Sequence, residues 1–127
     1  MPIDHDMPVL VVDDYRSMIN IIRSLLKQIG LEDVDEAVNG AEALQKLNER
    51  HHPLVVSDWY MEPMSGYDLL KEIRASAELA TTRFIMVTAE SKTENVIAAK
   101  KAGVDSYIVK PFNAQTLRSK INAVFGE

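Results

Sequence analysis

Short apolar runs alternate with longer amphipathic segments along the whole chain. The apolar runs lie at Val9–Val12, Val34–Val38, Pro53–Ser57, Phe84–Val87 and about 105–109. After each run, apolar residues recur at three- and four-residue steps, as on one face of a helix. The pattern therefore predicts five strand–helix units in succession.

The helical faces follow from the same steps. After the first strand, six apolar residues fall on the predicted face: Met18, Ile21, Ile22, Leu25, Leu26 and Ile29. Three later helices have shorter faces: Ala43, Leu44 and Leu47; Leu69, Leu70 and Ile73; Leu117, Ile121 and Val124. Gly30 and Gly103 stand where a helix C-terminus favours a left-handed residue. Thr93 is expected to cap the fourth helix.

Continuous apolar strands that alternate with helices predict a parallel sheet covered on both faces. Right-handed crossovers then give an α/β, doubly wound, three-layer (βα)5 sandwich of the flavodoxin-like kind. The second run is broken by acids and suits a sheet edge, which favours the strand order 2-1-3-4-5. No linker or shift in composition interrupts the units, so we expect one domain over residues 1–127, with its core at about 8–125.

Composition excludes several classes of function. The 127 residues have a net charge of −5 and no long basic run, which argues against nucleic acid as a partner. The chain has no cysteine, so disulfides, thiol catalysis and thiolate metal sites are excluded. The N-terminal acids and prolines are unlike a signal peptide, and no apolar run is long enough to span a membrane. We therefore expect a cytoplasmic protein with no membrane partner.

Polar residues follow four of the five predicted strands. They are Asp13 and Asp14 after the first strand, Asp58 after the third, Thr88 after the fourth and Lys110 after the fifth. The carboxyl ends of parallel strands meet at one edge of a sheet, and ligands bind there, where the strand order reverses. We therefore expect these side chains to share one rim.

The combination of residue types indicates metal-dependent phosphoryl chemistry. Two carboxylates about 4 Å apart repel by roughly 4 kcal/mol at an effective dielectric of about 20, so three need a cation. Oxygen ligands with open positions suit Mg²⁺. Lys110 and Thr88 would then contact phosphoryl oxygens by charge and by hydrogen bond. A carboxylate can itself accept a phosphoryl group, and Asp58, alone on its strand, is the natural acceptor.

Each of these residues taken singly has a plainer interpretation. The acids after the first strand suit a helix cap, Thr88 suits a strand end, and Lys110 suits a solvated charge. Their joint occurrence at four strand ends makes coincidence the poorer explanation. His51–His52 is interpreted as a solvated helix end rather than a metal site, because adjacent residues do not share a helix face.

The pattern of Asp-Asp after the first strand, Asp after the third, Thr after the fourth and Lys-Pro after the fifth resembles the receiver domains of two-component response regulators. The segments SDWYMEPMSGYDLL, VTAE and YIVKPF are similar to those of single-domain chemotaxis regulators. This resemblance covers about residues 8–125. It implies a signalling switch that catalyses only its own phosphorylation and dephosphorylation, in place of an enzyme with external substrates.

The resemblance also implies a metal site and a phosphorylation site. Asp58 would accept the phosphoryl group from a sensor histidine kinase of the chemotaxis type, or from a phosphotransfer protein. Asp14 and Asp58 would bind Mg²⁺ directly, together with the main-chain carbonyl of Tyr60, and Asp13 would act largely through water. Tyr60 departs from the familiar chemotaxis pattern, in which an asparagine stands at this position.

The remaining matched positions concern the switch. Lys110 would pair with the phosphoryl group, and Thr88 would move to hydrogen-bond it. Tyr107 would then change rotamer and alter the surface formed by the fourth helix, fifth strand and fifth helix. The bond between Lys110 and Pro111 is usually cis in the family.

The expected partners of this monomer are therefore proteins. The chain ends just past the fifth helix, so we expect output by contact with a protein such as a flagellar motor switch component. A phosphate sink or relay intermediate is an alternative. A Mg²⁺-dependent aspartyl-phosphate hydrolase is disfavoured, because such enzymes place an acid where Tyr60 stands. A flavin carrier is disfavoured because Asp13 and Asp14 would repel the cofactor phosphate.

Overall fold

The computed structural model describes residues 5–89 and 92–126. Five strands alternate with five helices: β1 (Val9–Val12), α1 (Arg16–Gln28), β2 (Val34–Ala37), α2 (Gly40–Glu49), β3 (Leu54–Asp58), α3 (Gly66–Ala75), β4 (Arg83–Thr88), α4 (Thr93–Ala102), β5 (Ser106–Val109) and α5 (Ala114–Val124). The strands pair in parallel in the order β2-β1-β3-β4-β5. The predicted fold class and strand order are confirmed, with β2 at an edge.

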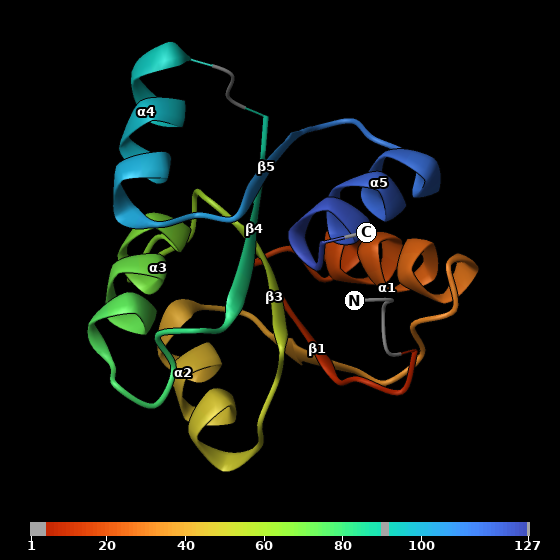
Figure 1. The fold of residues 1–127 in the computed structure, drawn as a ribbon, viewed down its shortest axis with the longest axis horizontal. Helices are drawn as coiled ribbons and strands as arrows, with labels where there is room; N and C mark the ends of the chain where they lie inside the picture. The colour runs from red at the N-terminus through yellow and green to blue at the C-terminus, as the bar shows by residue number, and fades with distance from the viewer. Residues whose placement is uncertain (1–4, 90–91, 127) are drawn as a thin grey trace.

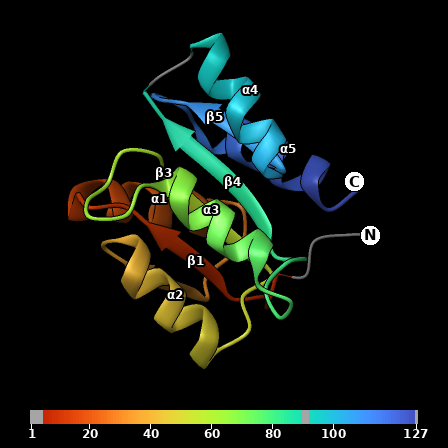
Figure 2. The same ribbon diagram turned by 90° about the vertical axis from the view of Figure 1, so that its left-hand side faces the viewer.

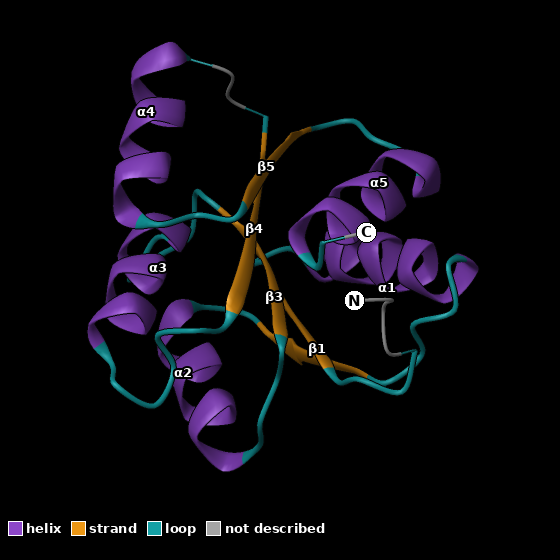
Figure 3. Cartoon of the chain, in the orientation of Figure 1, coloured by secondary structure: helices purple, strands orange, loops and turns teal. Residues whose placement is uncertain are grey.

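The helices form a layer on each face of the sheet. Helices α1 and α5 lie on one side, and α2, α3 and α4 lie on the other (Figure 1). Figure 2, turned by 90°, shows the layer of three helices in front of the strands, and Figure 3 shows the central strands between the two layers. Each layer closes its own core, one built with α1 and α5 and the other with α2 and α3. Among the described residues, no helix is long and apolar enough to cross a membrane.

The buried face of α1 differs from the predicted one. Ile19, Ile22 and Leu26 are fully buried, whereas Ile21 is 51 % exposed. The prediction placed Ile21 in the core and omitted Ile19. Both residues fit three- and four-residue steps, but the series that begins at Ile19 faces the sheet.

Three of the five helices begin at a side-chain N-cap, whereas α1 and α4 do not. Asn39, Ser65 and Asn113 each accept a hydrogen bond from a backbone N–H three residues later, as N-caps do. Thr93 is not a cap as predicted: it is the first residue of α4, and Lys92 occupies the cap position. Gly103, with φ of 96°, ends α4 in the expected left-handed conformation.

His52 corrects the expectation of a solvated helix end. Its side chain is fully buried, and Nε2 lies 2.7 Å from a carboxylate oxygen of Asp35 on the edge strand β2. This contact lowers the pKa of Asp35, against the burial that alone would raise it. His52 therefore packs the α2–β3 connection against the sheet edge.

Candidate functional site

The strand register brings the predicted rim together. Val12 is the partner of Ser57, so Asp13 and Asp58, one residue further on each strand, lie side by side at the carboxyl end of the sheet. Thr88 pairs with Val109 in the neighbouring strands. The next residue, Lys110, donates its backbone N–H to the Thr88 carbonyl at 2.8 Å.

The side chain of Lys110 extends across the carboxyl ends of the strands and reaches two acids. Its ammonium Nζ lies 3.0 Å from Asp58 Oδ1 and 3.6 Å from Asp13 Oδ2. The backbone N–H of Tyr15 donates to the other oxygen of Asp13 at 2.9 Å. Asp13 and Asp58 are buried, whereas Asp14 is exposed. The rim thus holds carboxylates in two environments, two enclosed and one facing solvent.

Burial has the largest effect on the pKa of each of the two enclosed acids. It raises the pKa of Asp58 above its usual value, and the hydrogen bond and charge of Lys110 offset this only in part. Burial likewise raises the pKa of Asp13, which the backbone N–H of Tyr15 opposes. Both carboxylates are therefore costly to hold in the charged form without a further cation.

The residues present fit a magnesium ion. Asp13, Asp14 and Asp58 each offer a carboxylate oxygen, and these atoms all lie within 4.8 Å of one another. Asp13 Oδ2 is buried and accepts no hydrogen bond from the described residues. Three carboxylates face the single ammonium of Lys110, so two negative charges remain for a divalent cation to balance. Oxygen ligands of this kind suit Mg²⁺.

The connection between β3 and α3 holds the end of β3 in position. Its key residue is Gly66, whose role the sequence analysis did not identify. The backbone N–H of Gly66 donates to the carbonyl of Trp59 at 2.8 Å. A Cβ atom on Gly66 would lie 2.0 Å from the Asp58 carbonyl oxygen. Only glycine permits this approach, so Gly66 fixes the start of α3 against the acceptor strand. Its position after a turn containing Pro63 was the available signal.

The remaining predicted residues lie around this rim. Thr88 is fully buried at the end of β4. Tyr107 lies within β5 and packs on the core beneath α2 and α3. The Lys110–Pro111 peptide bond is cis, as is usual in the family that the sequence resembles. A cavity of about 440 Å³ adjoins the site and is lined by Asp14, Trp59, Tyr60, Met61, Glu62 and Ser65.

The side chain of Tyr60 reaches α4. It is 51 % exposed, and its hydroxyl oxygen accepts a hydrogen bond from the Asn95 side chain at 3.3 Å. A role for the Tyr60 main-chain carbonyl in metal binding stays a prediction.

Fold and site together define a class of protein. It is a doubly wound α/β domain that carries, at the carboxyl ends of its central strands, an acidic cluster paired with a lysine from the last strand. This is the place where such sheets bind phosphorylated and metal ligands.

Comparison with known proteins identifies the family. The model of the response regulator receiver domain matches residues 9–122. The chain is 44 % identical over 123 residues to chemotaxis protein CheY-3 of Vibrio cholerae, covering 97 % of this chain and 95 % of that protein. It is 43 % identical over 119 residues to chemotaxis protein CheY of Pseudomonas aeruginosa, covering 94 % and 96 %. The solved structure of V. cholerae CheY4 superposes with a TM-score of 0.87 at 32 % identity, covering 94 % and 98 %.

The chain therefore belongs to the response regulator receiver domain family. It is a CheY-like receiver, a signalling switch of a phosphorelay and not a classical enzyme.

Proposed function

We propose that this protein is a stand-alone receiver of a chemotaxis-type phosphorelay, in which residues 1–127 form one domain and Asp58 accepts a phosphoryl group from a histidine kinase. The observation that carries the proposal is the contact of 3.0 Å between Lys110 Nζ and Asp58 Oδ1, within a rim whose three carboxylates lie within 4.8 Å. A phosphorylation site needs a carboxylate nucleophile beside fixed positive charge, and this rim offers both.

The proposed transfer needs only the phosphohistidine donor and a proton from solvent. A carboxylate oxygen of Asp58 attacks phosphorus and forms an O–P bond, while the N–P bond of the donor's phosphohistidine breaks. The electron pair stays on the imidazole nitrogen, which takes a proton from solvent. Asp14, Asp58 and the main-chain carbonyl of Tyr60 would hold Mg²⁺ directly, and Asp13 would hold it through water. The bound ion would supply positive charge to the phosphoryl oxygens.

Two residues of this chain would stabilise the charge that reaches the rim. The Lys110 ammonium already contacts Asp58 and would follow the added phosphoryl oxygens, forming charge-assisted hydrogen bonds. The Thr88 hydroxyl, on the adjacent strand, would hydrogen-bond another oxygen. The phosphoryl group carries about 1.5 to 2 negative charges, and Asp58 loses its own charge on forming the acyl phosphate, so the rim gains roughly one negative charge. This gain gives the contacts a differential strength between the two states.

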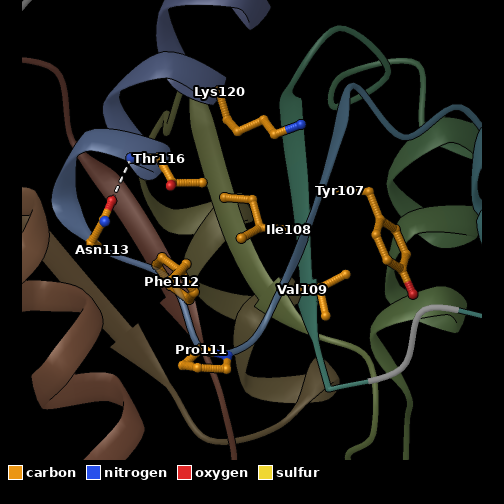
Figure 4. Close-up of a pocket in the computed structure, with 8 residues that line it drawn as sticks. All are labelled: Tyr107, Ile108, Val109, Pro111, Phe112, Asn113, Thr116 and Lys120. Atoms are coloured by element: carbon orange, nitrogen blue, oxygen red, sulfur yellow. Dashed lines mark hydrogen bonds between the residues drawn. The ribbon is translucent and has the colours of Figure 1, made fainter.

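The proposed output surface lies on α4, β5 and α5. A groove of about 480 Å³ runs along β5 and the start of α5 (Figure 4) and is lined by Tyr107, Ile108, Val109, Pro111, Phe112, Asn113, Thr116 and Lys120. Val109 on β5 and Ile97 on α4 are 41 % and 47 % exposed. Apolar exposure beside a groove suits binding of a partner protein, such as a flagellar motor switch component, by a receiver that is itself monomeric and cytoplasmic.

Intact mass after incubation with Mg²⁺ and a small acyl phosphate tests the acceptor. We expect one added phosphoryl group on the wild type and none on Asp58→Asn. Asp68→Asn is a matched control, because Asp68 is an exposed carboxylate of α3 outside the rim, and it should be phosphorylated normally. A wild-type mass that stays unchanged would refute the proposal.

The metal assignment has its own test. Trp59 is the single tryptophan and follows Asp58 directly, so addition of Mg²⁺ to the unphosphorylated protein should change its fluorescence. Asp14→Asn should raise the Mg²⁺ concentration that gives half of the fluorescence change at least several-fold. Equal titrations for the variant and the wild type would remove Asp14 from the metal site.

A pull-down with phosphorylated and unphosphorylated protein separates the two signalling roles. Retention of a motor component by the phosphorylated form alone supports motor output. Transfer of phosphoryl groups from the kinase with no phosphorylation-dependent partner supports the alternative role of phosphate sink or relay intermediate.

A further inference from the structure

Three aromatic rings form a continuous contact between the end of β3 and strand β5. The indole of Trp59 stacks on the ring of Tyr67, with centroids 5.4 Å apart and planes inclined by only 5°. The ring of Tyr107 meets the same indole edge-on, at 6.3 Å and 68°. Both separations lie in the range that aromatic pairs prefer. The contact therefore joins the neighbour of Asp58 to a strand that lies two places away in the sheet.

The backbone fixes one end of this contact. Gly66 donates its N–H to the Trp59 carbonyl, and its backbone lies so close to the Asp58 carbonyl that a Cβ atom would clash with it. Tyr67 is the next residue of α3. Its ring is consequently held beside the indole by the same turn that positions the acceptor aspartate.

Further interactions hold Tyr67 itself. The Lys71 ammonium lies 4.7 Å from the centroid of the Tyr67 ring, one helical turn along α3, within the range of a cation–π interaction. The Ser65 hydroxyl caps the first turn of α3 by accepting a hydrogen bond from the N–H of Asp68. Tyr67 therefore lies in the first turn of a capped helix, which holds its backbone in position.

Tyr107 stands on a less constrained element. It lies on β5, the edge strand, which pairs with β4 and with no other strand of the described residues. Its side chain packs with Trp59 against the core beneath α2 and α3, whereas the next residue, Ile108, enters the opposite core. Figure 4 shows Tyr107 on the other side of β5 from Phe112 and the groove residues of α5. The indole is thus a wall against which the Tyr107 ring rests.

We propose that Tyr67 is a positioning residue for the switch, which sets the position of Tyr107 by holding the indole of Trp59 between the two rings. This inference rests on the proposed function, in which Tyr107 alters the output surface. Asp58 and Tyr107 would then be coupled through the aromatic rings on the face of the sheet as well as through Thr88. An aromatic pair of this geometry changes an equilibrium by about 2- to 10-fold.

The test uses protein labelled with fluorotyrosine and observed by fluorine NMR. The chain has four tyrosines, and loss of one resonance in Tyr107→Phe assigns that residue. In unphosphorylated, metal-free protein, Tyr67→Leu removes the stacked ring and should displace the Tyr107 resonance by more than its line width. Tyr67→Phe keeps the ring and should leave the Tyr107 resonance in place.

The same variants give a second readout after phosphorylation by an acyl phosphate with Mg²⁺. We expect the ratio of the Tyr107 signals of the two states to change by about 2- to 10-fold in Tyr67→Leu, but not in Tyr67→Phe. A purely structural role for Tyr67 would lower the urea midpoint and leave this ratio unchanged. Should Tyr67→Leu fail to fold by circular dichroism, Tyr67→Met makes the same comparison.

A Tyr107 resonance that coincides in Tyr67→Leu and the wild type overturns the inference, even if fluorotryptophan shows that Trp59 has moved. The first readout needs no phosphoryl transfer. Failure of the proposed function would appear separately, as an unchanged intact mass in every variant.

Discussion

Asp13→Asn removes one buried negative charge from the rim and keeps a side chain of nearly the same shape. The amide oxygen can still accept the hydrogen bond that the Tyr15 N–H donates to Asp13 at 2.9 Å. The substitution therefore removes the charge and keeps this hydrogen bond, while an amide NH2 group takes the position of Oδ2 beside Lys110. We expect it to stabilise the metal-free protein by about 1 to 2 kcal/mol.

The expected sign comes from comparing three interactions. Asp13 and Asp58 oxygens lie within 4.8 Å, which gives a repulsion of about 3.5 kcal/mol at an effective dielectric of about 20. Lys110 at 3.6 Å from Asp13 attracts it by about 4.6 kcal/mol on the same scale. The exposed Asp14 repels it by about 1 kcal/mol, as in water. These charge interactions nearly cancel, so the desolvation of a fully buried carboxylate decides the outcome.

The pH dependence of the difference follows from the same cause. Burial raises the pKa of Asp13 above the unfolded value of 3.8, so the folded wild type binds the proton more tightly than the unfolded chain. Its stability relative to Asp13→Asn consequently falls as pH rises from the unfolded pKa through the raised folded pKa. The advantage of the variant should be absent below about pH 3.8 and reach a plateau above the folded pKa of Asp13.

Urea unfolding followed by circular dichroism, in buffer with a chelator, measures this difference. Glu78→Gln is the control, because it removes the same charge from an exposed position and should change stability by less than about 0.5 kcal/mol. Mg²⁺ at about 100 times its dissociation constant should then stabilise the wild type by about 2.7 kcal/mol and the variant by less. A lower urea midpoint for Asp13→Asn at neutral pH without metal would show that desolvation does not dominate.

Two further substitutions test the parts that hold the rim in place. Gly66→Ala should lower the free energy of unfolding by about 1 to 3 kcal/mol and slow phosphorylation of Asp58, because the new Cβ would lie 2.0 Å from the Asp58 carbonyl; an unchanged urea midpoint and rate would contradict this. Arg74→Met should cost about 1.5 to 3 kcal/mol, because the guanidinium donates to the carbonyl of Gly103 at 2.9 Å and to Asp105 at 2.8 Å. Arg74→Lys should restore little of that stability, since lysine lacks the planar fork, and full recovery in urea unfolding would count against the fork.

The sequence predicted the elements and the gathering of the rim because both depend on short-range patterns and on one topological rule. In a parallel sheet, every strand ends at the same edge, so residues such as Asp58 and Lys110 must approach each other once the strands are recognised. Their contact at 3.0 Å depends in addition on the conformation of the Lys110 side chain, which reaches past the intervening strand β4.

The features that escaped prediction depend on packing between distant segments. Ile19 and Ile21 fit the same helical spacing, and only the rotation of α1 against the sheet exposes Ile21. His52 was expected in solvent, but its buried side chain meets the half-buried carboxylate of Asp35, 17 residues earlier. The stacking of Tyr67 on Trp59 likewise depends on the close approach of Gly66, which no periodicity shows.

The charged groups at the two ends of the sheet differ in how completely they are paired. At the amino ends of β4 and β5, the Arg74 guanidinium has four acceptors within hydrogen-bond distance, three of them backbone carbonyls. At the carboxyl ends, three carboxylates share one lysine, and an oxygen of Asp13 accepts no hydrogen bond from the described residues. Stabilising polar contacts therefore concentrate where no chemistry is proposed. The opposite end keeps an excess of negative charge, so a bound cation is needed there to offset it before a phosphoryl group adds more.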